Sequence, residues 1–198
     1  MLSDLKNLQV LSLSRNSLGK PKKINPSGTK GGATSTSARL PKMPSIPSLP
    51  STLKQLKLDS NHFSSIPLSI YSPNLTKLQK LDFSNNNLAT IPVEISNLVA
   101  LLELNLDNNM IVSLPDTIGQ LKKLKALSLK NNQIQVTSTS FSDKNPQPLP
   151  ASLFTETPLI DLNLGGNQMT NTQLVSSIIL LYRFFMLIYL MHFPRNNS

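Results

Sequence analysis

Carboxylates are the side chains in this chain whose spacing could support chemistry. Asp59, Asp82 and Asp107 recur at nearly even intervals. If these aspartates lie on neighbouring strands of one sheet, their carboxylates are about 5 Å apart, close enough to act as a pair. The surrounding sequence indicates no apolar pocket that would raise the pKa of a carboxyl group. The aspartates are therefore interpreted as binding residues.

Other groups that catalyse reactions or bind metals are scarce. His62 and His192 are the two histidines, far apart in the sequence, and there is no cysteine. We find no Cys/His spacing for a metal, no glycine-rich phosphate loop and no candidate for a catalytic triad. The sequence therefore predicts a protein that is not an enzyme, with no catalytic residue, no metal and no cofactor.

The elements that position the aspartates come from one motif that occurs six times. The motif is Leu-x-x-Leu-x-Leu-x-x-Asn-x-Leu, with Phe, Ile or Met replacing some leucines, at residues 8–18, 53–63, 78–88, 101–111, 124–134 and 159–169. Side chains alternate across a strand, so Leu56 and Leu58 point to one side while Lys57 points to the other. Each motif therefore predicts a short strand with an apolar inner face and a polar outer face.

The asparagine of the motif falls where the chain must turn away from the strand. Its amide both donates and accepts hydrogen bonds, so it can satisfy backbone groups that a bend leaves unpaired. Stacked repeats would place these side chains in a structural ladder, formed by Asn16, Asn61, Asn86, Asn109, Asn132 and Asn167.

Segments that begin with an apolar residue and a proline follow several of the asparagines. In residues 66–70, 91–98 and 114–121 the apolar positions are three or four apart, as helical turns require. Ordering a unit costs roughly 1.5 kcal/mol per residue, and about seven buried apolar side chains at about 1.5–3 kcal/mol each do not offset this cost. Neighbouring units must therefore stack and share one core.

The repeated motif and the Ile/Leu-Pro-x-x-Ile-x-x-Leu segments resemble the leucine-rich repeat superfamily. The near-constant spacing of Leu81, Leu104 and Leu127 is most similar to the short intracellular, Ras-group-related members. The resemblance covers residues 53–171 well and residues 5–18 in part. It implies an α/β fold, a curved solenoid with a parallel β-sheet on the concave face and short helices or 3₁₀ turns on the convex face. It also implies a non-enzymatic adaptor or scaffold that binds a protein partner.

The concave face is the expected binding surface, made of the outward residues of each strand. The residues that we expect to bind protein are Lys57, Asp59, Lys80, Asp82, Ser84, Glu103, Asn105, Asp107, Ser128, Lys130, Asp161 and Asn163. The middle of this surface is polar and mildly acidic. We therefore expect a protein partner with some basic character, in intracellular signalling or assembly. The alternative is that this face is only solvated and that another surface binds.

The net charge of +9 is unevenly distributed. From residue 53 to residue 170, nine Lys and Arg residues balance nine Asp and Glu residues, whereas residues 1–52 carry eight basic residues against Asp4 alone. A neutral solenoid without a basic stripe does not favour nucleic acid as a partner. Without cysteine, disulfide-bonded end caps cannot form, and the first residues run directly into a repeat without a separate leader. We therefore expect a cytoplasmic location.

The motif is interrupted over residues 19–52, which are rich in Pro, Ser, Gly and Lys and contain no acidic residue. This composition predicts a disordered insertion between a first repeat at residues 1–18 and a main solenoid at residues 53–171. Pro41, Pro44, Pro47 and Pro50 fall at every third position, which would align them on one edge of a polyproline II rod. We interpret them as part of a stiff linker, with an SH3-like partner as the alternative.

Two further segments depart from the motif. Residues 137–148 form a second predicted loop, because Leu127 and Leu162 are 35 residues apart, about twelve more than the regular spacing. The tail at residues 172–198 contains an apolar run, residues 174–193, that is long enough for a membrane span but has Arg183 in its middle. Three interpretations stay open. The run covers the open end of the solenoid, it anchors a membrane-attached, receptor-like or tail-anchored protein, or it is an aberrant end.

Overall fold

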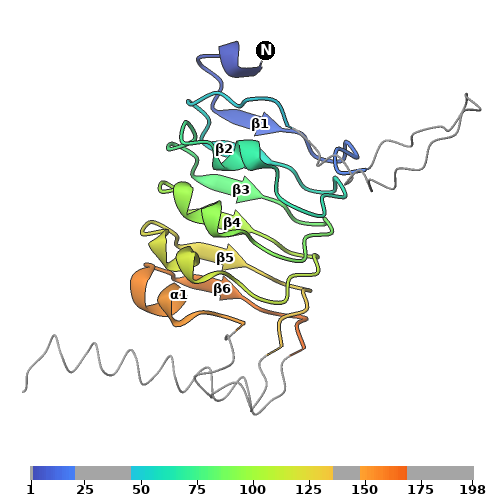
Figure 1. Ribbon diagram of the computed structural model, residues 1–198, viewed down its shortest axis with the longest axis vertical. Coiled ribbons are helices and arrows are strands. Elements are labelled where there is room, and N and C mark those ends of the chain that lie inside the picture. Colours follow the sequence, from blue (N-terminus) through green and yellow to red (C-terminus); the bar gives the residue numbers. More distant parts are fainter. Residues whose placement is uncertain (1, 21–45, 136–147, 169–198) are drawn as a thin grey trace, which may run out of the picture.

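The repeats stack into a single parallel β-sheet in the computed structural model, which describes residues 2–20, 46–135 and 148–168. Each described motif contributes one strand, and the strands are neighbours in sequence order (Figure 1). Their bounds are β1 Val10–Ser12, β2 Gln55–Lys57, β3 Lys80–Asp82, β4 Glu103–Asn105, β5 Ala126–Ser128 and β6 Asp161–Asn163. The sheet is open, because β1 and β6 lie at opposite edges.

The register of the sheet joins equivalent positions of the motif. The central leucine of each strand faces the central leucine of the next, in the order Leu11, Leu56, Leu81, Leu104, Leu127 and Leu162. Strand β1 pairs directly with β2, so the first repeat stacks on the others although 45 residues separate Leu11 from Leu56 in sequence. No further strand is inserted between these two neighbours.

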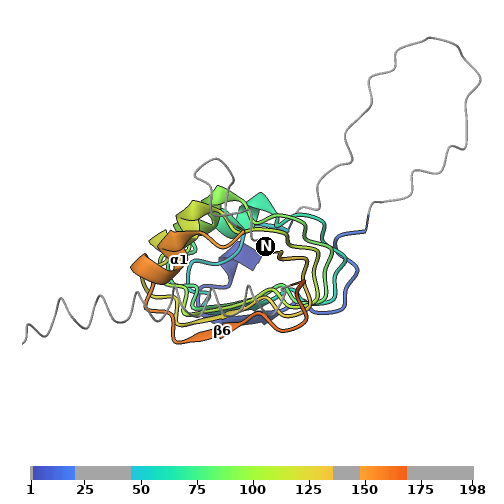
Figure 2. The ribbon, with the colours of Figure 1, turned by 90° about the horizontal axis from the view of Figure 1, so that it is seen from below.

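Four short helices, one after each of β2 to β5, form the side of the stack opposite the sheet (Figure 2). They are η2 Leu68–Tyr71, η3 Val93–Asn97, η4 Asp116–Gln120 and α1 Ala151–Glu156, whereas η1 Leu2–Asp4 precedes β1. A proline immediately precedes each of the four, at Pro67, Pro92, Pro115 and Pro150, with φ between −59° and −75°. The proline ring restricts φ to this range, and so it ends the extended segment and starts the helical turn. The predicted α/β solenoid is confirmed.

The core lies between the sheet and the helices. The inward strand residues of the central repeats are almost completely buried, and so are the apolar residues of the helical side such as Ile70, Ile95 and Ile118. Phe63 and Phe83, from neighbouring repeats, meet edge to face with ring centroids 5.7 Å apart. Burial, with a smaller contribution from the charge of Glu94, raises the pKa of the Tyr71 phenol. The core is therefore continuous from repeat to repeat.

The asparagine side chains link consecutive repeats along one side of the core. Asn86 donates from Nδ2 to the carbonyl oxygens of Leu58, Phe83 and Ser84, at 2.9–3.1 Å. Its Oδ1 accepts from the backbone N–H groups of Asn61 and Phe63. The side chains of Asn61, Asn109, Asn132 and Asn167 likewise bond to the backbone of the preceding repeat as well as their own. Asn16, in the first repeat, is exposed and bonds to Ser14 of its own turn.

The turn before each ladder asparagine requires a left-handed backbone. Ser60, Asn85, Asn108, Asn131 and Gly166 precede the ladder residues and have φ between 54° and 71°. Asparagine and glycine tolerate this conformation better than most residues. The double asparagines of the motif therefore have two roles, since the first makes the turn and the second satisfies the backbone groups.

The structure corrects the boundary of the predicted insertion at residues 19–52. Ile46 and Leu49 are buried in the core, and Pro50 is buried as well. These residues complete the first repeat, because they occupy the place of Ile66 and its neighbours in the next repeat. Residues 21–45, including Pro41 and Pro44, lie outside the described residues. Since Pro50 is buried while Pro47 is exposed, the four prolines do not present one common free edge.

The second predicted loop and the tail lie largely outside the described residues. The chain is back in the stack at Pro148, whose carbonyl oxygen accepts a hydrogen bond from Leu114 N at 2.8 Å. Residues 136–147 and 169–198, which include the apolar run at 174–193, are not described. Within the described ranges, no helix has the length and apolarity needed to cross a membrane.

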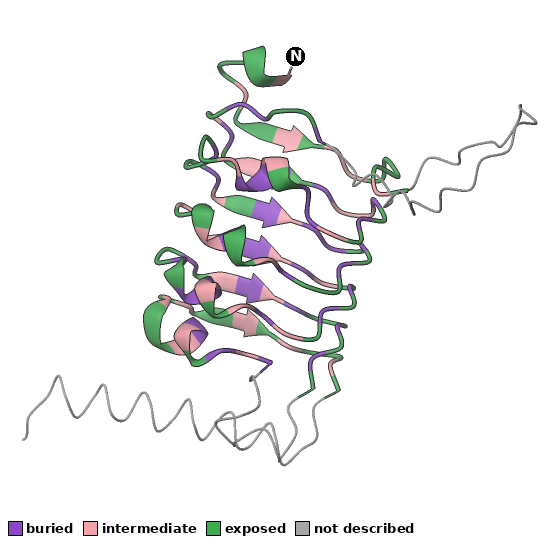
Figure 3. Ribbon diagram, in the orientation of Figure 1, coloured by how far each residue is buried: buried purple, intermediate pink, exposed green. Residues whose placement is uncertain are grey.

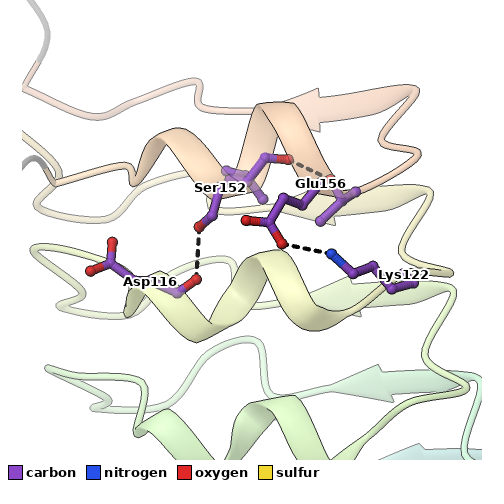
Figure 4. Close-up of polar contacts among 6 residues, drawn as sticks. Asp116, Lys122, Ser152 and Glu156 are labelled. Atoms are coloured by element: carbon purple, nitrogen blue, oxygen red, sulfur yellow. Dashed lines mark hydrogen bonds and ion pairs between the residues drawn. The ribbon is translucent and has the colours of Figure 1, made fainter.

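The helix α1 closes the helical side by packing on η4 (Figure 4). Ser152 Oγ donates to the Asp116 carbonyl oxygen at 2.7 Å, and Lys122 Nζ lies 2.6 Å from Glu156 Oε2. Gly119 makes this close approach feasible, because a Cβ atom there would lie 2.5 Å from Ser152 Cβ. The repeat that contains the second insertion therefore keeps its helical side in contact with its neighbour.

The ladder predicts a large effect of removing one amide. Asn86→Ala leaves several buried backbone groups without partners, so we expect it to lower the free energy of unfolding by about 3 kcal/mol. Urea denaturation followed by circular dichroism measures this change. Asn87→Ala is the matched control, because Asn87 is exposed next to it, and it should change stability by less than about 0.5 kcal/mol. Equal effects of the two substitutions would contradict the ladder's role.

The contact between α1 and η4 predicts a steric effect of a single methyl group. Gly119→Ala places Cβ against Ser152, so we expect a loss of about 1–3 kcal/mol in the free energy of unfolding. Gly165→Ala is the control, because its nearest neighbour is the Asn163 side-chain oxygen at 3.3 Å. A Gly119→Ala variant as stable as the control would show that α1 does not pack there.

Candidate protein-binding surface

The outward side chains of the sheet line a groove of about 450 Å³ over strands β2 to β6. Each strand contributes its first and third residues, since these alternate with the buried central leucine. The first row consists of Gln55, Lys80, Glu103, Ala126 and Asp161, and the second row consists of Lys57, Asp82, Asn105, Ser128 and Asn163. Asp107, two residues after β4, completes the polar lining.

The first row combines charged side chains with one alanine. Lys80 Nζ lies 2.7 Å from Glu103 Oε1, and both side chains are about half exposed at 48% and 50%. An ion pair this exposed contributes little to stability, at about 0–1 kcal/mol. Ala126 lies between Glu103 and Asp161 in the register and forms a small floor between two carboxylates. The side chains of this row can therefore change position on ligand binding at little cost in free energy.

The second row is held more firmly. Asp82 Oδ1 accepts from Ser84 N at 2.9 Å, Asn105 Oδ1 accepts from Asp107 N, and Asn163 Oδ1 accepts from Gly165 N. In each case a side-chain oxygen binds the N–H two residues on, which is the hydrogen bond of an Asx turn. These residues are therefore predicted binding residues that also shape the turn after their strand.

Asp107 and Asp59 connect neighbouring repeats beyond the strands. Asp107 Oδ1 accepts from Ser128 Oγ at 2.5 Å and from Lys130 N at 2.8 Å. Asp59 accepts from the hydroxyl group of Ser14 in the preceding repeat. The adjacent repeat therefore orients each carboxylate. The two hydrogen bonds of Asp107 also fix the position of its second carboxylate oxygen.

The structure separates the predicted binding residues into three groups. Those that it brings together in the groove are Lys57, Lys80, Asp82, Glu103, Asn105, Asp107, Ser128, Asp161 and Asn163. Asp59 and Lys130 follow their strands and do not line the groove. Ser84 was expected to point outward, but it is 7% exposed. The small serine lies between the larger Asp59 and Asp107 of the adjacent repeats, so its side chain is covered.

Apart from the central leucines of the strands, two lining residues were not among the predicted binding residues. Gln55 and Ala126 occupy the same register positions as Lys80 and Glu103. The alternation that identifies the outward face also identifies them, because each is the first residue of its strand. Their small or neutral side chains give the groove part of its depth.

The arrangement of carboxylates does not favour the paired acid–base chemistry considered from sequence. Asp82 lies on its strand, whereas Asp59 and Asp107 lie two positions further along in their repeats. Asp82 and Asp107 are instead engaged by backbone N–H groups. In the part of the chain that the structure describes, no group of three or more His, Cys, Asp or Glu residues could hold a metal ion.

Comparison with models of known protein families identifies the family of this chain. A leucine rich repeat model matches residues 51–111, and a second leucine rich repeat model matches residues 7–28. The chain belongs to the leucine-rich repeat superfamily. Leucine-rich repeat domains are generally protein-interaction modules.

Similar solved structures include a leucine-rich repeat protein. A Leptospira interrogans leucine-rich repeat protein is 34% identical, with a TM-score of 0.53, over 66% of this chain and 29% of its own. The Listeria monocytogenes protein InlP is 31% identical, with a TM-score of 0.49, over 63% of this chain and 32% of its own. The chain thus spans about a third of the length of these proteins. Among curated proteins, none matches the sequence.

The hydrogen bonds of Asp107 predict that its charge can be removed without loss of the fold. In Asp107→Asn the side-chain oxygen still accepts from Ser128 Oγ and Lys130 N, so we expect less than about 0.5 kcal/mol of destabilisation. Asp107→Ala removes both acceptors and should cost about 1–2 kcal/mol. Thermal denaturation of the two variants measures the difference. If Asn and Ala cost the same, the hydrogen bonds contribute nothing.

Proposed function

We propose that this protein is a non-enzymatic adaptor or scaffold that binds a protein partner in the groove on the outer face of its sheet. The observation that carries the proposal is the composition of the groove, where polar and charged side chains from five consecutive strands line one hollow. An extended segment of a partner lying across the strands would meet hydrogen-bonding groups from every repeat. A broad polar surface of this kind is typical of protein recognition, whereas small ligands typically bind in enclosed apolar pockets.

The charges of the groove support a partner with basic character. Two lysines and four carboxylates line it, and the pair Lys80 and Glu103 neutralise each other. Lys57 then lies at one end, and Asp107 and Asp161 lie toward the other. Complementary charges on a partner would speed association and fix its orientation in the groove.

We also propose that the protein acts inside the cell, in signalling. The composition of the chain supports the intracellular location. The chain contains no cysteine, so the stack is stabilised by its core and by the asparagine ladder rather than by disulfide bonds. Proteins that work in oxidising compartments commonly use such bonds. An SH3-like partner at the proline run receives no support, because Pro50 is buried.

A charge-neutralised groove tests the proposal. Asp82→Asn, Asp107→Asn and Asp161→Asn together remove three negative charges while keeping the size and the acceptor oxygen of each side chain. We would select binders to the wild-type chain from a displayed library of 12-residue peptides and measure their affinities for both proteins. We expect the selected peptides to be enriched in Lys and Arg, and to bind the variant at least about tenfold more weakly.

The control removes the same number of charges from the opposite side. Glu94→Gln, Asp116→Asn and Glu156→Gln lie on η3, η4 and α1, and this triple variant should bind the selected peptides with unchanged affinity. Circular dichroism verifies that both variants fold. Selected peptides without basic residues would contradict the proposed partner chemistry. Equal binding to the groove variant and the wild type would contradict the groove itself.

A further inference from the structure

The C-terminal end of the solenoid leaves apolar side chains partly uncovered. In the central repeats, the inward leucines Leu81, Leu104 and Leu127 are at most 2% exposed, whereas their equivalent in β6, Leu162, is only half-buried. The same drop in burial occurs at Leu159 and Leu164. Figure 3 shows the change, since the centre of β5 is buried and the centre of β6 is not. In the part of the chain that the structure describes, the last repeat has no neighbour of the kind that covers every central repeat.

Other groups at this end are incompletely covered as well. Ile160 is 83% exposed, the largest exposed fraction among the large apolar residues of the described chain. Phe154 of α1 packs on the core but is only half-buried. Within the described residues, no strand lies beside the outer edge of β6, and an open edge of this kind readily pairs with other chains. This end of the solenoid therefore exposes apolar side chains next to the core. The backbone of β6 also has no partner strand on its outer edge over the described ranges.

We propose that residues 174–193 of the same chain cover this end. Gln168, the last described residue, follows the turn after β6. Residue 174 is six residues further, a reach of roughly 20 Å at full extension. The opposite edge, β1, lies five strand spacings away, about 24 Å. The apolar run therefore starts beside the uncovered end, where its local concentration is far higher than that of any separate molecule.

The chemistry of the run matches this surface. Residues 174–193 contain no acidic residue, and Arg183 is their single Lys or Arg. Asp161 on β6 is exposed and offers a carboxylate for Arg183 at the same edge. In the hydrocarbon of a membrane the arginine would have no such partner, and its burial there is costly. Covering this end of the solenoid therefore explains both the apolar residues of the run and its single charged side chain, Arg183.

Cysteine chemistry tests the assignment without interference, because the chain has no cysteine of its own. Single cysteines at Leu162 and Leu11 form a matched pair, since these residues occupy equivalent positions on the two edge strands and both are half-buried. In the purified full chain, we expect Leu162→Cys to react with maleimide at least tenfold more slowly than Leu11→Cys. Replacing Ile178, Leu181, Phe185 and Ile188 by serine should remove this difference.

Cross-linking identifies the occupant. A second cysteine is placed in turn at Ser176, Ser177, Tyr182 and Tyr189, and a short bismaleimide joins it to the cysteine at position 162 or 11. We expect intramolecular cross-links to position 162 and none to position 11. The same samples are then mixed with phosphatidylcholine vesicles and separated by flotation. We expect the chain to remain unbound with position 162 still protected.

Three results would overturn the proposal. Cross-links formed only between molecules would make a second copy of the chain the occupant. Flotation with the vesicles, together with fast labelling at position 162, would assign the run to the membrane. Equal labelling at positions 162 and 11 without cross-links to either would show that the end is uncovered.

Discussion

The pairing of each repeat with the next in strict register is the constraint on which this structure depends. One repeat cannot bury its own apolar residues, because its strand and its helical turn each cover only one side of the core. When Leu104 faces Leu81 and Leu127, every inward side chain is enclosed from both sides. The asparagine ladder enforces the same register, since each amide from the second repeat onward bonds to carbonyl oxygens of two repeats at once, as Asn109 does. Packing and hydrogen bonding therefore require the same alignment.

That alignment also determines the binding surface. Residues on the outer face take their positions from leucines on the inner face, so the backbone of the groove is held as firmly as the core beneath it. Several of its side chains are fixed further by local hydrogen bonds, as at Asp82 and Asn105. Others are exposed, such as Asp161 and the ion-paired Glu103. The surface thus combines fixed acceptors with adaptable charges, which allows specificity without a preformed pocket.

Much of this architecture could be predicted from sequence, because the motif records both the alternation of the strand and the position of the turn. The leucine spacing identified the inward face, and the prolines marked where the helical turns begin. The failures have local causes. Ser84 follows the outward alternation, but its neighbours in adjacent repeats are larger and cover it. Residues 46–52 look like a linker by composition, yet Ile46 and Leu49 are in the register of the core. Contacts of this kind depend on residues of another repeat, which the local sequence does not contain.

The two insertions occur at the same point in the sequence of their repeats. Residues 21–45 and 136–147 both follow the turn after a ladder asparagine and both precede an apolar–proline step, Ile46–Pro47 and Leu149–Pro150. At this junction the strand and its ladder bonds are complete, and the helical turn has not begun. Length can therefore change there without altering either the curvature of the sheet or the spacing of its side chains. The same junction in other repeats, such as that at Ala89 and Thr90, which are exposed, is where new sequence could be grafted while the recognition face stays intact.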